Sequence, residues 1–252
     1  MILLLMLKDM RYNIDRGGYM KKKIIIVLGV IIGIFLVLVA YFFFFDMNQE
    51  NQLKAEITEL EELVNAKNID IEAVNQKLNE TVAKDDYAKV EKAFKSYLKD
   101  SFDNSIAITE ILNDARLTNI LTVENYQKDG KEFTQTKQYI AETKQELEER
   151  KKKYTEHLTE EKAMSYINDK GLDSYYVEFY KRELVGDMSD VKQDKTVENS
   201  IDEILSLLDS SEKVIQFLAS HPNDWNIEGE TIAFSNPTLK SDYDQLIAQV
   251  VK

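Results

Sequence analysis

Hydrophobic and polar residues follow three different patterns along this chain. Residues 24–45 form one uninterrupted apolar run, apolar residues recur every three or four positions from there to Pro222, and residues 224–234 show alternation. A long apolar run is typical of a membrane span, a spacing of three and four indicates amphipathic helices, and alternation indicates strands. The pattern therefore predicts a mainly α-helical protein with a single N-terminal transmembrane helix, a helical stalk, an extracytoplasmic helical bundle and a small C-terminal β-hairpin.

The apolar run extends from Ile24 to Phe45 and contains 22 residues without a charge. At about 1.5 Å per residue such a helix is roughly 33 Å long, enough to cross a hydrocarbon layer of roughly 30 Å. A cleaved signal peptide is the alternative. The run exceeds the usual signal-peptide core of roughly 7 to 15 residues, and no A-x-A-like cleavage site follows it. We therefore expect one uncleaved span.

Basic residues around the span indicate its orientation. Lys54 is the only basic residue in the first 15 positions after it. Three lysines directly precede it as a topogenic signal: Lys21, Lys22 and Lys23. The positive-inside rule then places residues 1–23 in the cytoplasm and residues 46–252 outside the cell. The expected localisation is the cell membrane.

Translation has two candidate starts, Met1 and Met20. Residues 16–20 can be encoded by a sequence with AGGAGG a few nucleotides before ATG, the form of a bacterial ribosome-binding site. We hypothesise that translation begins at Met20 and that residues 1–19 are an untranslated leader. An ordinary short cytoplasmic tail is the alternative, and the mass of the intact native protein distinguishes the two.

Residues 46–83 are expected to form a juxtamembrane helical stalk. Apolar residues there are spaced as in a heptad repeat, at Leu53, Ile57, Leu60, Val64, Ile71, Val74 and Leu78. This spacing fits a coiled coil, and it fits an intramolecular amphipathic helix equally well. Gly29 and Gly33 form a small-xxx-small motif within the span. A homodimer through span and stalk is one interpretation; the other is that glycine is common in membrane helices.

Residues 84–252 are predicted to form one extracytoplasmic helical domain. Its expected elements are a helix capped by Asp85 or Asp86, a short helical turn ending at Gly130, a charged helix over 131–157, a helix from Thr159 to Gly171, a helix capped by Asp173, a loop over 186–195, a helix that Pro222 ends, a hairpin near 224–234 and a helix that starts at Pro237.

Composition narrows the partners of this outer part. The chain has 32 basic and 45 acidic residues, of which 26 basic and 43 acidic ones follow the span, for a net charge of about −17. Such a domain repels nucleic acid and anionic lipid headgroups. The chain has no cysteine, which excludes a disulfide and a lipid-modified cysteine.

Motifs for catalysis, metals and cofactors are missing from the sequence. The two histidines, His157 and His221, lie far apart and outside any metal-ligand spacing, and we expect both on the surface. Adjacent acidic residues at 85–86 and 160–161 are expected in so acidic a chain. We therefore expect no catalytic residue, no metal and no cofactor.

Aromatic residues supply the candidate binding surface. Five of them lie close together in the sequence at Tyr166, Tyr175, Tyr176, Phe179 and Tyr180, and the only tryptophan is Trp225. Exposed aromatic rings can stack on sugars or anchor a protein partner. The alternative, which we favour, is that the cluster packs at a corner between two helices and that Trp225 and Phe234 fasten the hairpin to the bundle.

These features together indicate a function class. We expect a noncatalytic binding or scaffold protein of the bacterial cell envelope, acting on an envelope protein or a wall polymer. The alternative is an accessory or regulatory subunit of a membrane complex, in which span and stalk bind the partner. A third, weaker interpretation is an envelope hydrolase with two facing carboxylates about 5 to 9.5 Å apart.

Overall fold

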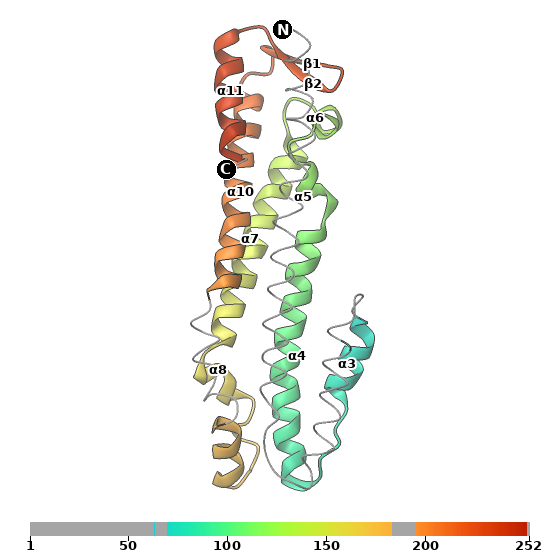
Figure 1. Ribbon diagram of the computed structural model, residues 1–252, viewed down its shortest axis with the longest axis vertical. Coiled ribbons are helices and arrows are strands. Elements are labelled where there is room, and N and C mark those ends of the chain that lie inside the picture. Colours follow the sequence, from blue (N-terminus) through green and yellow to red (C-terminus); the bar gives the residue numbers. More distant parts are fainter. Residues whose placement is uncertain (1–62, 64–69, 183–194, 251–252) are drawn as a thin grey trace. The chain divides into compact units, whose positions relative to one another are not determined.

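The computed structural model of the chain describes residue 63, residues 70–182 and residues 195–250. Helices account for most of these residues, and the strands among them form one two-stranded antiparallel hairpin (Figure 1). The predicted mainly α-helical fold with a small C-terminal hairpin is thus confirmed. No helix in the described part of the chain is long and apolar enough to cross a membrane. The predicted span, with Gly29, Gly33 and the three lysines before it, lies outside the described residues.

The elements follow the order that the sequence predicted. They are α3 (Ile71–Asn79), α4 (Asp85–Asn113), α5 (Ala115–Asn119), α6 (Val123–Asp129), α7 (Thr134–His157), α8 (Glu160–Ser165), α10 (Thr196–Ser220), β1 (Trp225–Glu228), β2 (Thr231–Phe234) and α11 (Pro237–Val250). Residues 174–182 are also helical. The predicted loop over 186–195 lies almost entirely outside the described residues.

Short polar side chains cap the N-termini of several helices. The Asp70 carboxylate accepts a hydrogen bond from the Ala73 amide at 3.0 Å, and the Thr159 hydroxyl accepts one from the Lys162 amide at 3.2 Å. Asp173 likewise accepts from the Tyr175 amide at 3.1 Å. These bonds satisfy amides that have no partner inside the helix. The helix starts predicted at Thr159 and Asp173 are confirmed, and Asp70 caps α3 in the same way.

One predicted boundary is wrong. The helix after Thr159 does not continue to Gly171 but ends at Ser165, and turns follow it. Ile167 is fully buried in these turns, and Asp169 adopts the left-handed conformation with φ of 63°. Aspartate tolerates this conformation better than most residues. Burial of Ile167 therefore decided the boundary, which the glycine alone did not reveal.

The described residues belong to two compact units. One unit, here the α3 unit, contains residues 63, 70–108, 150–182 and 195–198; the other, the hairpin unit, contains residues 109–149 and 199–250. Helices α4, α7 and α10 each contribute residues to both units. Each unit has its own set of buried side chains and is described separately below.

The core of the α3 unit joins helices far apart in the sequence. Its buried residues are Val74, Leu78, Val90, Ala93, Tyr97, Leu98, Phe102, Leu158, Ala163, Ile167 and Tyr180. Val74 and Leu78 of α3 occupy predicted heptad positions, and the structure buries both against this core. For these two residues the intramolecular interpretation describes the structure. Ile71, the heptad position before them, is 43% exposed, and the predicted positions from Leu53 to Val64 lie outside the described residues.

Glu91 holds the connection between α3 and α4. Its side chain is buried, and its carboxylate accepts hydrogen bonds from the amides of Val82 at 3.0 Å and Ala83 at 2.8 Å. Lys95 lies one helical turn further along α4, and its Nζ is 2.9 Å from the same carboxylate. One side chain therefore satisfies two loop amides and one largely buried cation.

Replacing Glu91 with Ala should destabilise the α3 unit. The change leaves two amides without their acceptor and removes the carboxylate partner of Lys95, whose ammonium still donates to the Glu80 carbonyl at 3.0 Å. The expected cost is about 3 kcal/mol in the free energy of unfolding. Urea unfolding followed by circular dichroism measures this cost. Glu178→Ala, at an exposed position of the same unit, is the control and should change stability by less than about 0.5 kcal/mol. Equal stability of the two variants would contradict this role of Glu91.

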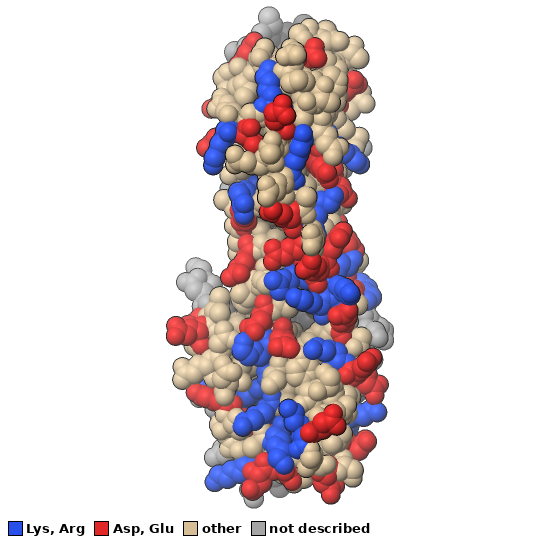
Figure 2. All heavy atoms as spheres, turned by 180° about the vertical axis from the view of Figure 1, so that it is seen from behind, with Lys and Arg blue, Asp and Glu red and all other residues tan. Residues whose placement is uncertain are grey.

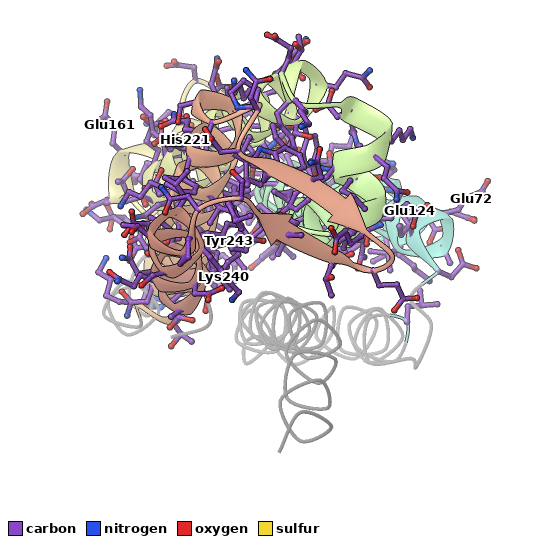
Figure 3. The ribbon with its side chains drawn as sticks, turned by 90° about the horizontal axis from the view of Figure 1, so that it is seen from above. Glu72, Glu124, Glu161, His221, Lys240 and Tyr243 are labelled. Carbon is purple, nitrogen blue, oxygen red and sulfur yellow. The ribbon has the colours of Figure 1, made fainter. Side chains whose placement is uncertain are left out.

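The hairpin unit ends in a tight hairpin. Trp225 pairs with Phe234 and Glu228 with Thr231, which leaves a two-residue turn. Gly229 in this turn has φ of 63°, a conformation that favours glycine and is typical of such turns. Figure 3 shows the hairpin beside α11, which carries the labelled Tyr243. The Tyr243 ring lies 5.2 Å from that of Phe234 between centroids.

Trp225 and Lys131 fix the hairpin to the helices of its unit. The Trp225 ring is 1% exposed, and its Nε1 donates to the Leu218 carbonyl at 2.9 Å. The ring stacks near Phe133, with centroids 6.0 Å apart. Lys131 Nζ donates to the carbonyls of Pro222 and Trp225 at 2.5 and 2.7 Å. The small sheet is thus held by burial of one ring and by one cation.

Candidate functional site

A polar pocket in the α3 unit is the main candidate site. It has a volume of about 350 Å³. It lies between residues 100–104 of α4, the C-terminal end of α7 and the beginning of α8. Three acidic and three basic side chains line it together with four other residues: Asp100, Ser101, Asp103, Asn104, Arg150, Lys153, Tyr154, Glu156, His157 and Lys162. We call it the His157 pocket.

His157 is one of two buried polar residues that line this pocket; the other is Ser101. His157 is only 7% exposed, so the expectation of a surface histidine is wrong for this residue. The imidazole stacks on the Tyr97 ring, with centroids 3.9 Å apart and planes at 18°, and meets the edge of the Tyr166 ring. The Tyr97 hydroxyl donates to the His157 carbonyl at 3.1 Å. Two tyrosines therefore fix the ring.

The imidazole of His157 is neutral at physiological pH. Burial lowers its pKa to about 4; the nearby Asp100 carboxylate opposes this shift, Lys162 adds to it, and a hydrogen bond to the Tyr97 backbone opposes it. A hydrogen bond to the backbone that favours the protonated imidazole must run from a ring N–H to a carbonyl oxygen, here that of Tyr97. Within the described part of the chain Nε2 has no hydrogen-bond partner, so we assign this donor to Nδ1. Nε2 then carries a lone pair that accepts.

Each acidic residue of the pocket already has a partner. The Tyr166 hydroxyl donates to Asp100. Asp103 forms an ion pair with Lys99 at 2.6 Å, and Glu156 pairs with Lys152 at 3.7 Å. The two ion pairs offset the charges of Asp103 and Glu156, whereas the Tyr166 hydroxyl satisfies Asp100 without removing its charge.

Two lysines supply positive charge at the pocket. Lys153 and Lys162 are exposed, and neither forms an ion pair with any residue that the structure describes. Lys162 Nζ lies 4.8 Å from the centroid of the Tyr166 ring, which positions its ammonium by a cation–π contact. Figure 2 shows basic and acidic side chains intermixed over the face it presents. Side chains of both signs also line the pocket itself.

The pocket walls are held in place by a bond between backbone and side chain. Asn104 of α4 donates to the Arg150 carbonyl of α7 at 3.2 Å. This bond ties the two helices where they border the pocket. The site is therefore preformed by the packing of rigid helices, which favours binding without a large rearrangement.

The residues of the predicted aromatic surface differ in how deeply the structure buries them. Tyr180 is fully buried and its hydroxyl donates to the Ala163 carbonyl at 2.9 Å. Tyr166 is half-buried at the His157 pocket. Tyr176 and Phe179 are half-buried against the Tyr87 ring, with centroids 5.1 and 6.3 Å away.

Tyr175 is the exposed member of the predicted aromatic set, at 57%. Its ring meets the Tyr176 ring edge to face at 5.3 Å. Trp225, in the hairpin unit, is buried beneath the hairpin. Of the predicted aromatic residues, Tyr175 is thus exposed with the half-buried Tyr176 beside it, while Tyr180 and Trp225 contribute to packing.

Sequence reasoning missed most of the His157 pocket. The sequence indicates Tyr166, which contacts Asp100 and His157, only as an aromatic residue, and it indicates none of the charged residues that line the pocket as a site. One signal was present: His157 follows Tyr154 by three positions and precedes the buried Leu158, so it falls on the apolar stripe of α7. A histidine on such a stripe is a candidate for burial.

Metal ligands do not converge in the described part of the chain, where no group of three or more His, Asp or Glu side chains is arranged to hold an ion. Comparison with protein-family models, curated proteins and solved structures finds no significant match.

Proposed function

We propose that this chain is a membrane-anchored binding or scaffold protein of the bacterial cell envelope, with residues 24–45 as its anchor. The uncharged run and the three lysines before it support a single span with the N-terminus inside. Both units described above follow this segment in the sequence. They are then displayed outside the cell on the C-terminal side of the span.

The observation that carries the binding role is the His157 pocket. It combines a buried imidazole acceptor, two lysines at its rim and helices tied to one another at its wall. Concave sites with a few fixed polar groups are typical of ligand recognition. The neutral imidazole and the paired carboxylates favour recognition over acid–base chemistry, which needs a group that exchanges protons near the working pH.

Crosslinking in intact cells tests this proposal. The full chain should fractionate with membranes, and protease added outside the cell should cleave residues 70–250. A chain whose residues 24–45 are replaced by an unrelated span should retain its crosslinked partners. Protection of residues 70–250 from external protease would overturn the proposed topology.

The same span exchange tests the second candidate, an accessory subunit of a membrane complex. The Gly29–Gly33 motif supports this alternative, because small residues at this spacing let membrane helices pack closely. If the span and the stalk bind the partner, the exchange abolishes crosslinking while membrane fractionation is unchanged. That result would replace the first proposal with the second.

A further inference from the structure

We propose that the His157 pocket binds an oxyanion that also carries a hydrogen-bond donor, such as hydrogen phosphate or a polyol phosphate with a free hydroxyl. This inference rests on the binding role proposed above and specifies the ligand class. It follows from two features of the pocket, one of which favours a negative charge on the ligand and the other a hydrogen-bond donor. The first is the positive charge at the rim, and the second is the buried acceptor.

The rim requires a negative charge. Lys153 of α7 and Lys162 of α8 line the pocket without an ion pair to any described residue, whereas Asp103 and Glu156 have lysine partners outside the lining set. Asp100 is engaged by the Tyr166 hydroxyl. A hydroxyl donor does not remove the charge of Asp100, so Lys153 and Lys162 together outweigh this one carboxylate and leave a local excess of positive charge, which an anion offsets.

The buried acceptor requires a donor. His157 Nε2 is buried, and its neutral ring offers a lone pair there rather than an N–H group. A buried polar atom without a partner is unfavourable, and a ligand hydroxyl or N–H removes that cost. A fully deprotonated anion instead places a second lone pair against the first and is rejected.

Hydrogen phosphate and sulfate distinguish these requirements because both are tetrahedral dianions at pH 7.5 to 8. Hydrogen phosphate keeps one O–H, and sulfate has none. In calorimetric titration of the detergent-solubilised full chain, we expect inorganic phosphate to bind about tenfold or more tightly than sulfate, from the cost of an unmet buried acceptor. Glycerol phosphate, as a third probe, shows whether the free ion or a polyol phosphate is the better ligand.

Three variants locate the binding. Lys153→Met and Lys162→Met should each weaken binding of phosphate and of sulfate alike. His157→Phe retains an aromatic ring to stack on Tyr97 and should reduce phosphate binding to the level of sulfate. Lys170→Met, at an exposed position of the same unit outside the pocket, is the matched control and should change neither affinity. Thermal melting of each variant confirms that the fold persists.

Three results would overturn the inference. Equal binding of sulfate and phosphate would remove the donor requirement, and binding unaffected by Lys153→Met and Lys162→Met would place the anion elsewhere. Absence of binding by all three probes at millimolar concentration would exclude the oxyanion class. The membrane and crosslinking experiments are independent of these titrations, so failure of the ligand class and failure of the proposed function are distinguishable.

Discussion

Replacing Trp225 with Ala is expected to lower the free energy of unfolding of the hairpin unit by about 3–5 kcal/mol, because truncating a large buried ring loses burial and leaves a cavity. The ring is 1% exposed and lies against Phe133 and Tyr126, with centroids 6.0 and 6.4 Å away. The change also leaves the Leu218 carbonyl without the indole donor. Few single residues of this unit combine so much contact area with a buried hydrogen bond.

Hydrogen exchange of the backbone amides measures the effect within the unit. In Trp225→Ala, amides of β1, β2 and α11 should exchange faster than in the unchanged protein. Trp225→Phe retains a ring but loses the hydrogen bond, and should cost less than Trp225→Ala. Tyr175→Ala removes an aromatic ring that is 57% exposed and is the matched control. A loss below 1 kcal/mol in Trp225→Ala would show that the hairpin is held mainly by Lys131.

The second large effect is a loss of stability in acid caused by His157. Its pKa is about 4 in the folded protein and about 6.5 in an unfolded chain. Between these values the unfolded state binds a proton that the folded state does not, so folding weakens as the pH falls. The contribution is fully present above about pH 6.5 and is lost toward pH 4, and its size is roughly 3 kcal/mol.

Urea unfolding at several pH values between 4 and 7 measures this dependence. His157→Phe cannot take up the proton, so the slope of unfolding free energy against pH should be smaller in this variant. Carboxylates titrate in both proteins and largely cancel in the comparison. An NMR titration gives the same information directly, as the midpoint of the His157 ring shift. A midpoint near 6.5 would contradict the burial of the ring.

The two predictions concern buried side chains, and the sequence indicates the burial of one of them but not of the other. Trp225 is the only tryptophan and lies in an alternating segment, so its role in fastening the hairpin was one of the interpretations that the sequence offered. His157 lies in a helix of mostly charged residues, and the sequence predicted a surface position. The difference arises because alternation is a local pattern, whereas burial of one histidine depends on which helices pack against it.

The sequence by itself located most helix and strand limits, because these limits depend largely on neighbouring residues; the end of α8 at Ser165 instead of Gly171 is the exception described above. Asp70, Thr159 and Asp173 supply oxygen atoms to amides within the next few positions. Pro222 and Gly229 restrict or free the backbone at their own positions. The hydrophobic spacing in turn identifies the buried face of each helix. None of these effects needs contact between distant parts of the chain.

The tertiary structure alone decided the pocket and the partner of α3. Asp100 and Lys162 come from different helices, and their distance along the chain says nothing about a shared pocket. Burial of Val74 and Leu78 in the core of the α3 unit favours intramolecular packing for these two residues over a coiled coil, which the heptad spacing fits equally well. A periodic apolar stripe specifies that a face is buried. Only the packing of the helices in three dimensions specifies what buries it and which polar groups are enclosed with it.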